Sequence, residues 1–466
     1  MTRCKFLFFC LCVFIFFNSA AWAGEVSPLT EKDRILVLAP HPDDETIGAG
    51  GLLQDAAHRG LPVRVVYLTN GDSNEWAFLV SEKRLVFKRS GVIHMGGVRQ
   101  KEAAAAMALI GIPKEQLIFL GYPDAGTLNI FTQYWGVTQP YRSLLTRVTR
   151  VPYKNGFSTG APYVGESILR DLERILLDFK PTRIFVSHPL DNNPDHRAFY
   201  LFLCVALWDL EKKIPQPEIY PYLVHEAHWP APGGFDPELR LEPPERLKTT
   251  DIAWNFFDLS PVQIQKKKEA LDFYSTQIQY SAAYLYSFAR RNELFGDYPV
   301  LVLKENEEEL MDWQAIESKQ NIRGEPVDED ESGEQFLESL AYAVKDGFLY
   351  VKVNPRAWTD KWLGINLHLL GYKKGLPFSY MPKYRLKISF GRRVTVYEKG
   401  RRVFIRDMKV ERAGKAVVVK FPLASLESPH YILSSTRTHL KEVPVDRTAW
   451  RILRIEGAPA QKILMK

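Results

Sequence analysis

The chain has 466 residues, 46% of them hydrophobic and 25% charged, so it is long enough to bury one large core and a smaller second one. The net charge of +6 is spread without long runs of lysine or arginine. This excludes the concentrated basic stripe that nucleic-acid phosphates require. The composition therefore predicts two domains and no nucleic-acid partner.

The first 23 residues have the three parts of a secretory signal peptide. Arg3 and Lys5 precede an apolar run over residues 6–17, and small residues lead to an expected cleavage site after Ala23. The run is shorter than the roughly 20 residues that span a bilayer, with an uncleaved anchor as the alternative, and no later stretch predicts a membrane span. We expect an exported protein, periplasmic or secreted, without an internal disulfide, because only Cys204 remains after cleavage.

Apolar strands alternate with amphipathic helices in the next part of the chain. Strands are expected at 35–39, 63–69, 117–120 and 183–187, and helices at about 46–59, 99–110, 166–179 and 195–210. This alternation is typical of βαβ units. It predicts an α/β fold: a Rossmann-like, mostly parallel sheet with helices on both faces.

The alternation of strands and helices is interrupted at residues 122–164. This long aromatic stretch predicts a rim over a functional site. Residues 305–335 are acidic and polar and predict an interdomain linker. Short β-type runs then follow at 348–353, 363–369, 384–390, 393–397, 403–410 and 415–421. The expected division is a leader at 1–23, an α/β domain at 24–304, the linker, and an antiparallel β-sandwich at 336–466.

The aromatic residues of the expected sandwich invite a carbohydrate-binding interpretation. They are Trp358, Trp362, Tyr372 and Tyr380. A purely structural module explains them equally well.

The strongest local signal is Pro40-His41-Pro42-Asp43-Asp44-Glu45, which follows the first strand. In open α/β sheets the carboxyl ends of the strands form the ligand crevice. His41 offers a nitrogen ligand and Asp44 a carboxylate oxygen, both suited to zinc, which leaves Asp43 free beside the metal. The alternative is that these residues only begin a helix, where proline and acidic side chains are favoured.

Three glycines, Gly48, Gly50 and Gly51, follow this motif and could suggest a dinucleotide-binding loop. The motif itself occupies the turn where such a loop would have to lie. We therefore expect these glycines to allow close packing of a helix.

A second polar set, residues 187–196, lies where another strand ends, with the sequence Ser-His-Pro-Leu-Asp-Asn-Asn-Pro-Asp-His. A catalytic metal needs three protein ligands and one open position. A helix cap at Asp195 and a surface histidine at His196 would explain these residues singly. They would not explain two such sets at equivalent strand ends.

These two motifs resemble those of the PIG-L/LmbE family, zinc-dependent deacetylases that remove acetyl groups from N-acetylglucosamine-containing substrates. The resemblance covers roughly residues 33–280. Weaker matching blocks are Arg99-Gln100-Lys101-Glu102, Gly121-Tyr122-Pro123-Asp124, and the set Lys268, Ala270, Tyr274 and Gln277. The resemblance implies an N-acetylated sugar or glycan as the substrate.

The resemblance also implies roles for individual residues. His41, Asp44 and His196 correspond to the zinc ligands and Asp43 to the general base. Arg99 is similar to a substrate-contacting arginine, Asp124 is expected near the sugar, and Asp195 is expected to orient a neighbouring group.

The chain departs from the family at Asn193, where many members have a histidine that is thought to stabilise the oxyanion. An asparagine can donate a hydrogen bond there but cannot deliver a proton. Either Asp43 acts as base and then as acid, or another histidine, His188 or His225, takes the missing role.

Two other functions are compatible with this sequence. The Asn193 departure allows a catalytically silent glycan-binding protein of the same fold. Two histidines and one carboxylate also match the facial triad of non-haem iron, so Fe2+ is the alternative to Zn2+, although Asp43 would then have no task.

Overall fold

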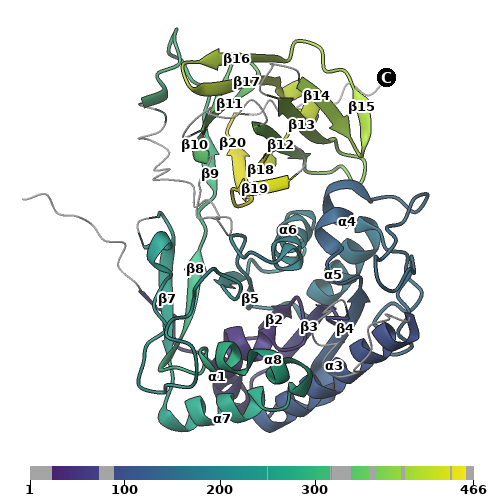
Figure 1. The fold of residues 1–466 in the computed structure, drawn as a ribbon, viewed down its shortest axis with the longest axis vertical. Helices are drawn as coiled ribbons and strands as arrows, with labels where there is room; N and C mark the ends of the chain where they lie inside the picture. Colours follow the sequence, from purple (N-terminus) through teal and green to yellow (C-terminus); the bar gives the residue numbers. More distant parts are fainter. Residues whose placement is uncertain are drawn as a thin grey trace, which may run out of the picture.

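The computed structural model describes residues 24–72, 89–248, 250–314, 316, 337–355, 363–389, 394–440 and 443–457. The leader expected at 1–23 and most of the linker expected at 305–335 lie outside these residues. Figure 1 shows an α/β part, at the bottom of the view, and a β-rich part above it.

The α/β part is built on an eight-stranded sheet with the order β1-β7-β8-β6-β5-β2-β3-β4. The strands from β6 to β4 are parallel to their neighbours, whereas β8 runs antiparallel to both β6 and β7. The bounds are β1 Gly24–Glu25, β2 Ile35–Ala39, β3 Val63–Thr69, β4 Leu117–Tyr122, β5 Arg183–Ser187, β6 Glu218–Tyr222, β7 Ala253–Asp258 and β8 Asn292–Asp297. The mostly parallel α/β sheet expected from the sequence is confirmed.

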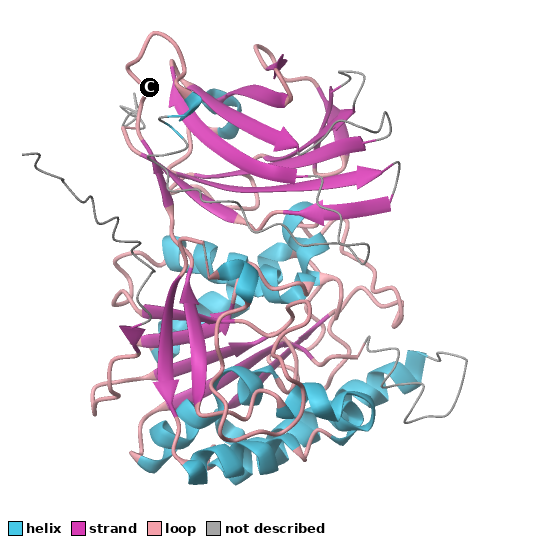
Figure 2. Cartoon of the chain, turned by 60° about the vertical axis from the view of Figure 1, so that its left-hand side comes forward, coloured by secondary structure: helices cyan, strands magenta, loops and turns pink. Residues whose placement is uncertain are grey.

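Helices cover both faces of this sheet (Figure 2). Their bounds are α1 Asp44–His58, α3 Arg89–Ile110, α4 Thr127–Gln133, α5 Gly165–Phe179, α6 Pro194–Asp209, α7 Pro261–Leu271 and α8 Ser275–Tyr286. Alternate side chains of β2 enter different cores: Val37 joins the core under α1, α3 and α7, and Leu38 joins the core under α5 and α6. A strand buried on both faces explains why β2 is a continuous apolar run.

The glycines of α1 allow close packing, as expected. A Cβ on Gly48 would lie 2.5 Å from the ring of Tyr222 in β6, and one on Gly51 would lie 2.2 Å from Leu259. The helix that follows the first site loop is therefore held directly against the sheet.

The β-rich part is an antiparallel sandwich, as predicted. A four-stranded sheet, β10-β11-β17-β16, faces a larger one, β15-β14-β13-β12-β18-β20-β9, in which β19 pairs with β18. Residues of both sheets, such as Val351 and Leu367, share one core. The bounds are β9 Leu301–Leu303, β10 Leu337–Lys345, β11 Phe348–Pro355, β12 Leu363–Tyr372, β13 Lys383–Ser389, β14 Val394–Glu398, β15 Arg401–Val403, β16 Lys409–Ala413, β17 Ala416–Pro422, β18 Tyr431–Leu440, β19 Val443–Arg447 and β20 Arg451–Ile455.

Two details of the sandwich differ from the sequence prediction. The single strand expected at 403–410 is wrong: β15 and β16 belong to different sheets, and Asp407 between them has a φ of 63°, which interrupts an extended chain. The strand β9 pairs with β20, so the chain joins the sandwich before residue 305, where the linker was expected to begin.

The two parts share an apolar interface. Phe378 and Trp450 of the sandwich belong to the same buried cluster as Phe131 of α4, and the rings of Trp208 and Tyr431 stack with their centroids 4.4 Å apart. Of the four aromatic residues considered for carbohydrate binding, Tyr372 is buried and Tyr380 is 79% exposed, and the other two lie outside the described residues. The sandwich is thus a packed part of the molecule.

Two further properties concern the described residues alone. Cys204 is buried in α6 with a free thiol. In that part of the chain, no helix combines the length and the hydropathy that crossing a membrane requires.

Candidate metal centre

The first site loop leaves β2 and turns sharply into α1. His41 and Asp43 occupy the turn, and Asp44 is the first residue of the helix. The backbone of Asp43 has a φ of 124°, a conformation that side-chain-bearing residues rarely adopt and that costs about 1–3 kcal/mol. Such strain persists where the surrounding structure fixes it, which is typical of functional loops.

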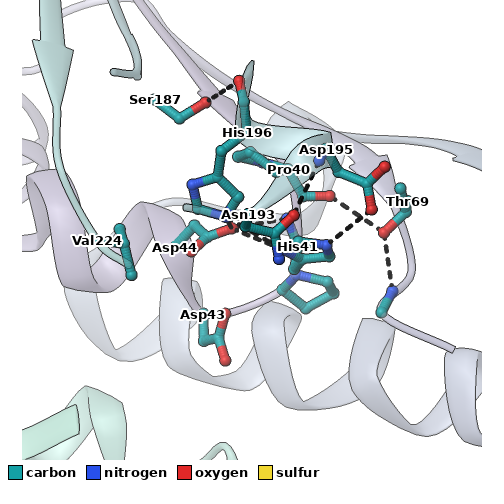
Figure 3. A network of polar contacts seen from close by, with 12 residues as sticks. Pro40, His41, Asp43, Asp44, Thr69, Ser187, Asn193, Asp195, His196 and Val224 are labelled. Carbon is teal, nitrogen blue, oxygen red and sulfur yellow. Dashed lines mark hydrogen bonds and ion pairs between the residues drawn. The ribbon is translucent and has the colours of Figure 1, made fainter. Parts of the chain in front are cut away.

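The second site loop leaves β5 and begins α6. Asn193 caps this helix, because its Oδ1 accepts a hydrogen bond of 2.8 Å from the backbone N–H of Asp195. Pro194 occupies the first turn, where its fixed φ is favourable. His196 therefore lies in the first turn of α6, close to His41 and Asp44 (Figure 3).

His41, Asp44 and His196 converge on one point, as the sequence predicted (Figure 3). The Nδ1 of His41 lies 3.2 Å from Oδ2 of Asp44 and 3.3 Å from Nε2 of His196. The Nε2 of His196 lies 3.1 Å from Oδ2 of Asp44. Ligand atoms about 2.0–2.1 Å from a tetrahedral ion lie about 3.3–3.4 Å apart. Two nitrogens and one oxygen at these separations fit a single divalent cation.

The outer nitrogen of His41 is held by two carboxylates. Its Nε2 lies 3.2 Å from Oδ1 of Asp124 and 3.4 Å from Oδ2 of Asp195. Asp195 also accepts hydrogen bonds from the backbone N–H groups of Ala125, at 2.6 Å, and Thr127, at 3.0 Å. A carboxylate behind a ligating imidazole fixes its tautomer and its orientation, so this contact favours Nδ1 as the ligand atom.

Asp191 holds two histidines at once. Its Oδ2 lies 3.1 Å from Nδ1 of His196, and its Oδ1 lies 3.2 Å from Nδ1 of His225. It also accepts backbone hydrogen bonds from Asn193, Val224 and His225. The role of Asp191 was missed in the sequence, although the residue lies within the second motif.

The close packing of charged groups shifts the pKa values of the side chains in the cluster. Burial opposes a charge on His196, but Asp191 and Asp44 outweigh it and raise the pKa of His196 to about 9. Burial also disfavours the anion of Asp44, yet the two histidines hold the pKa of Asp44 well below its usual range. A cation at this point therefore has to displace protons from the imidazoles, so its binding depends on pH.

Asp43 lies beside the cluster without joining it. Burial, the largest cause, raises the pKa of Asp43 to about 7, against the opposing effect of Arg99. The guanidinium of Arg99 is buried and lies 3.2 Å from Oδ2 of Asp43, and it also donates to the carbonyls of Pro42 and Gly71. Arg99 thus holds the strained turn through these hydrogen bonds. Its expected contact with substrate stays a prediction.

Two other groups of side chains have similar spacing. One consists of Asp191, His196 and His225, and the other of His41, Asp124 and Asp195. Asp191 accepts three backbone N–H hydrogen bonds and Asp195 accepts two, on both oxygens of each carboxylate, which makes them supports for the imidazoles; Asp44 accepts one, from His41 at 2.8 Å. His41, Asp44 and His196 remain the set best suited to a metal.

The two histidines considered for the missing role lie in different surroundings. His188 is fully buried; burial lowers its pKa to about 3, and its ring packs against Trp254 and Tyr298. The side chain of His225 is 39% exposed, and its ring meets that of His196 at a centroid distance of 4.6 Å. The structure therefore places His225, and not His188, at the cluster.

The aromatic stretch at 122–164 contributes backbone and core. Ala125 and Thr127 bind Asp195, whereas Trp135, Tyr141, Tyr153 and Tyr163 are buried. This stretch therefore contacts the site through its backbone, while most of its rings pack inside, and the rim over the site stays a prediction.

Comparison with known proteins identifies the segment that carries both loops. Residues 36–207 match the family described as PIG-L: GlcNAc-PI de-N-acetylase. Among curated relatives, a 1D-myo-inositol 2-acetamido-2-deoxy-alpha-D-glucopyranoside deacetylase of Mycobacterium sp. (strain KMS) is 35% identical over 102 residues, which are 22% of this chain and 32% of the relative. Its counterpart from Corynebacterium diphtheriae is 37% identical over 97 residues, 21% of this chain and 32% of that protein. The chain spans about a third of the length of these relatives.

Solved structures align with larger shares of the chain at low similarity. The N,N′-diacetylchitobiose deacetylase from Pyrococcus horikoshii is 19% identical, with a TM-score of 0.35, over 56% of this chain and 82% of that chain. A 4-carboxy-2-hydroxymuconate hydratase from Pseudomonas putida is 17% identical, with a TM-score of 0.36, over 60% and 100% of the two chains. These likenesses carry no argument about chemistry. The family match rests on the sequence, and the matched segment, residues 36–207, includes His41, Asp44 and His196.

Proposed function

We propose that this protein is a metal-dependent N-deacetylase that removes the acetyl group from an N-acetylglucosamine-type sugar or glycoconjugate. The observation that carries the proposal is the convergence of His41, Asp44 and His196 on one point, with the carboxylate of Asp43, which Arg99 holds, beside them. The names of the curated relatives, which are deacetylases of an acetamido-sugar, agree with this reaction.

Zinc is the cation that we propose, with Fe2+ as the alternative, because two imidazoles and one carboxylate are a ligand set of catalytic zinc sites. When bound, such an ion supplies a Lewis acid that makes a water molecule acidic enough to react near neutral pH. The leader sequence adds export to the proposal.

The side chains around the cluster have the remaining catalytic roles. Asp43 accepts the proton of the attacking water and then delivers it to the nitrogen of the leaving amine as the C–N bond breaks, and Arg99 holds that carboxylate in place. Asn193 uses Oδ1 as a helix cap, which leaves its amide N–H groups for the developing oxyanion. Because Asp191 can only accept, neutral His225 carries its proton on Nδ1, and its Nε2 accepts a hydrogen bond from the substrate.

The first test combines metal analysis with acetate release. The purified protein is expected to contain about one equivalent of zinc and to release acetate from N-acetylhexosamine mono- or oligosaccharides. A chelator is expected to abolish the release, and added zinc to restore it. Binding of these sugars without any release of acetate by the metal-loaded protein would instead identify a silent glycan-binding protein.

The second test is the substitution Asp43→Asn. Loss of the general base is expected to lower kcat by about 10²–10⁴-fold, because the amide cannot accept the proton. Metal content, measured by elemental analysis, is expected to stay at the wild-type level, since Asp43 is not a ligand. A variant that keeps wild-type turnover would refute the assignment of Asp43 as the base.

A further inference from the structure

The large sheet of the sandwich carries a group of basic residues on one face. Successive residues of a strand point to opposite faces of a sheet. Leu367 of β12 and Leu386 of β13 point into the sandwich core, so their sequence neighbours, and the residues paired with those neighbours, point outward. The outward residues form two adjacent lines across the strands, which we call the basic strip: Arg402, Tyr397, Arg385, His368 and Ser435 in one line, and Thr395, Lys387, Asn366, Arg437 and Arg447 in the other.

The basic strip concentrates positive charge that no run in the sequence reveals, because its members come from different strands. Five of its ten residues are arginine or lysine, and none is aspartate or glutamate. Arg402 and Arg437 are exposed, and Arg385 and Lys387 are partly exposed. Burial, and then the charges of Arg385 and Arg437, lower the pKa of His368 to about 4. The cations of the strip are thus close enough to act on one another, and an anion bound among them would relieve their repulsion.

A small hollow lies beside His368, between the strip and the end of α4. Its volume is about 10 Å³, which is roughly the space of one water-sized group. The lining includes Lys383, Arg385 and Lys399, and it contains no acidic residue. The hollow is therefore suited to a single anionic oxygen.

One end of the basic strip lies at the second site loop. Arg447 donates two hydrogen bonds to Asn192, the sequence neighbour of Asn193. Its strand, β19, lies at the edge of the sandwich that faces α6 (Figure 1). From Arg447 to Lys387 of β13 the strip crosses three strand spacings, a length of about 14 Å at about 4.8 Å each. An extended chain bound along the strip is thereby led to the loop that carries His196.

The residues between the cations favour a glycan over other polyanions. Asn366, Thr395 and Tyr397 can exchange hydrogen bonds with sugar hydroxyls. A membrane surface calls for exposed apolar side chains beside the cations, and single-stranded nucleic acid calls for several stacking rings. Among its ten residues, the strip has one tyrosine, Tyr397, and the guanidinium of Arg385 covers its ring at 4.9 Å.

We propose that the basic strip binds an acidic glycan, whose sugar units carry carboxylates, and directs its N-acetylated units to the metal centre. Arginine suits this ligand, because its planar guanidinium pairs with a carboxylate through two parallel hydrogen bonds. The role of the glycan as a substrate rests on the proposed deacetylase function, whereas its binding to the strip does not depend on turnover.

The test compares an acidic with a neutral oligosaccharide by calorimetric titration. The wild type is expected to bind a hyaluronan hexasaccharide, which alternates glucuronic acid with N-acetylglucosamine, at least 10-fold more tightly than neutral chitohexaose. This preference is expected to shrink with added salt, which screens exposed charges. The double substitution of Arg385→Gln with Arg437→Gln should weaken binding of the acidic hexasaccharide at least 10-fold. The matched control, Lys409→Gln with Arg412→Gln, removes two charges from exposed positions of β16 in the other sheet and should keep the wild-type affinity.

Equal affinity of the wild type for the two oligosaccharides, or equal weakening by the two double substitutions, would overturn the strip proposal. Tighter binding to phosphatidylglycerol vesicles or to a single-stranded DNA oligonucleotide than to the hyaluronan hexasaccharide would overturn it as well. Melting temperatures verify that the variants are folded. If the double variant is unfolded, Arg437→Gln alone decides, at an exposed position: affinity lowered about 3-fold supports the strip, and unchanged affinity overturns it.

Acetate release separates this proposal from the proposed function. In an active deacetylase, the strip variant should raise KM for the hyaluronan hexasaccharide at least 10-fold, with kcat unchanged and with wild-type kinetics on chitohexaose. Acetate release from chitohexaose without preferential binding of the acidic hexasaccharide would refute the strip and leave the deacetylase function intact. Preferential binding without acetate release from either oligosaccharide would refute the deacetylase function and leave the strip as a glycan-binding site.

Discussion

At the scale of single residues, the second site loop has Asn193 where the family resemblance predicts a histidine, and Asp191 two residues before it. Asp191 fixes the rings of His196 and His225, and Asn193 caps α6 with one end of its amide. Because the cap uses only Oδ1, the structural role and the proposed catalytic role of Asn193 belong to different atoms. This separation makes the two roles testable.

Asn193→Asp retains a cap oxygen but removes the N–H donors. Asp and Asn are about equally good caps, so the melting temperature is expected to stay near that of the wild type. Loss of one oxyanion donor is expected to lower kcat by about 10²–10³-fold in the acetate assay. Asn193→Ala should lose both functions, with a further stability loss of about 0.5–2 kcal/mol in denaturant unfolding. Full activity of Asn193→Asp would contradict the oxyanion role.

At the scale of elements, the strand β19 of the sandwich reaches the second site loop. The Nη2 of Arg447 donates to the carbonyl of Asn192, at 3.0 Å, and to its Oδ1, at 2.8 Å. Arg197 of α6 donates to the same carbonyl from within the α/β part. The sandwich therefore helps to position Asn192 in the second site loop.

Arg447→Met is expected to loosen this loop. Hydrogen bonds from a charged donor contribute about 1.5–3 kcal/mol, and we expect a decrease of about 10-fold in kcat/KM with zinc content unchanged. The control is Arg454→Met, which removes the same charge from an exposed residue of β20 that pairs with Glu456. Equal kinetics for Arg447→Met and the wild type would show that the sandwich does not position the loop.

At the scale of the whole molecule, the interface between the two parts contains a pair of carboxyl groups. Asp209 at the end of α6 accepts a hydrogen bond of 2.7 Å from Tyr372 of the sandwich, and it faces Glu173 of α5, with Lys213 nearby. Burial, and then the charge of Asp209, raise the pKa of Glu173 to about 7. The folded protein thus binds this proton more tightly than the unfolded chain.

The sign of the pH effect follows from that raised pKa. The contribution of Glu173 to the stability of the folded protein is expected to fall as the pH rises from about 4.5, the value for a free glutamate, to about 7. Glu173→Gln removes the titrating group, so its melting temperature at pH 8 should exceed that of the wild type, with a smaller difference at pH 5. Glu115→Gln, at an exposed glutamate, serves as the control and should show no such pattern. An equal difference at both pH values would contradict the pair.

The net charge of the whole chain does not show that positive and negative charges are unevenly distributed along it. Residues 336–466 contain 26 lysines and arginines but only 10 acidic residues, whereas the rest of the chain is acidic. The acidic excess lies at residues 305–335, whereas residues 24–304 are nearly balanced, with 31 basic and 33 acidic residues. Lys374 of the basic sandwich pairs with Glu211 of the α/β part at 2.6 Å. A whole-chain average could not reveal this uneven distribution.

The sequence by itself determined the α/β fold, the sandwich and the three converging side chains. Strand periodicity and the polar residues that follow β2 and β5 are local features, and parallel strands bring their carboxyl ends to one edge. Only the tertiary structure decided that Asp191 holds both His196 and His225, and that His188 is buried elsewhere. It also decided where Arg447 lies, because contacts between segments far apart in the chain depend on packing, which no local pattern encodes.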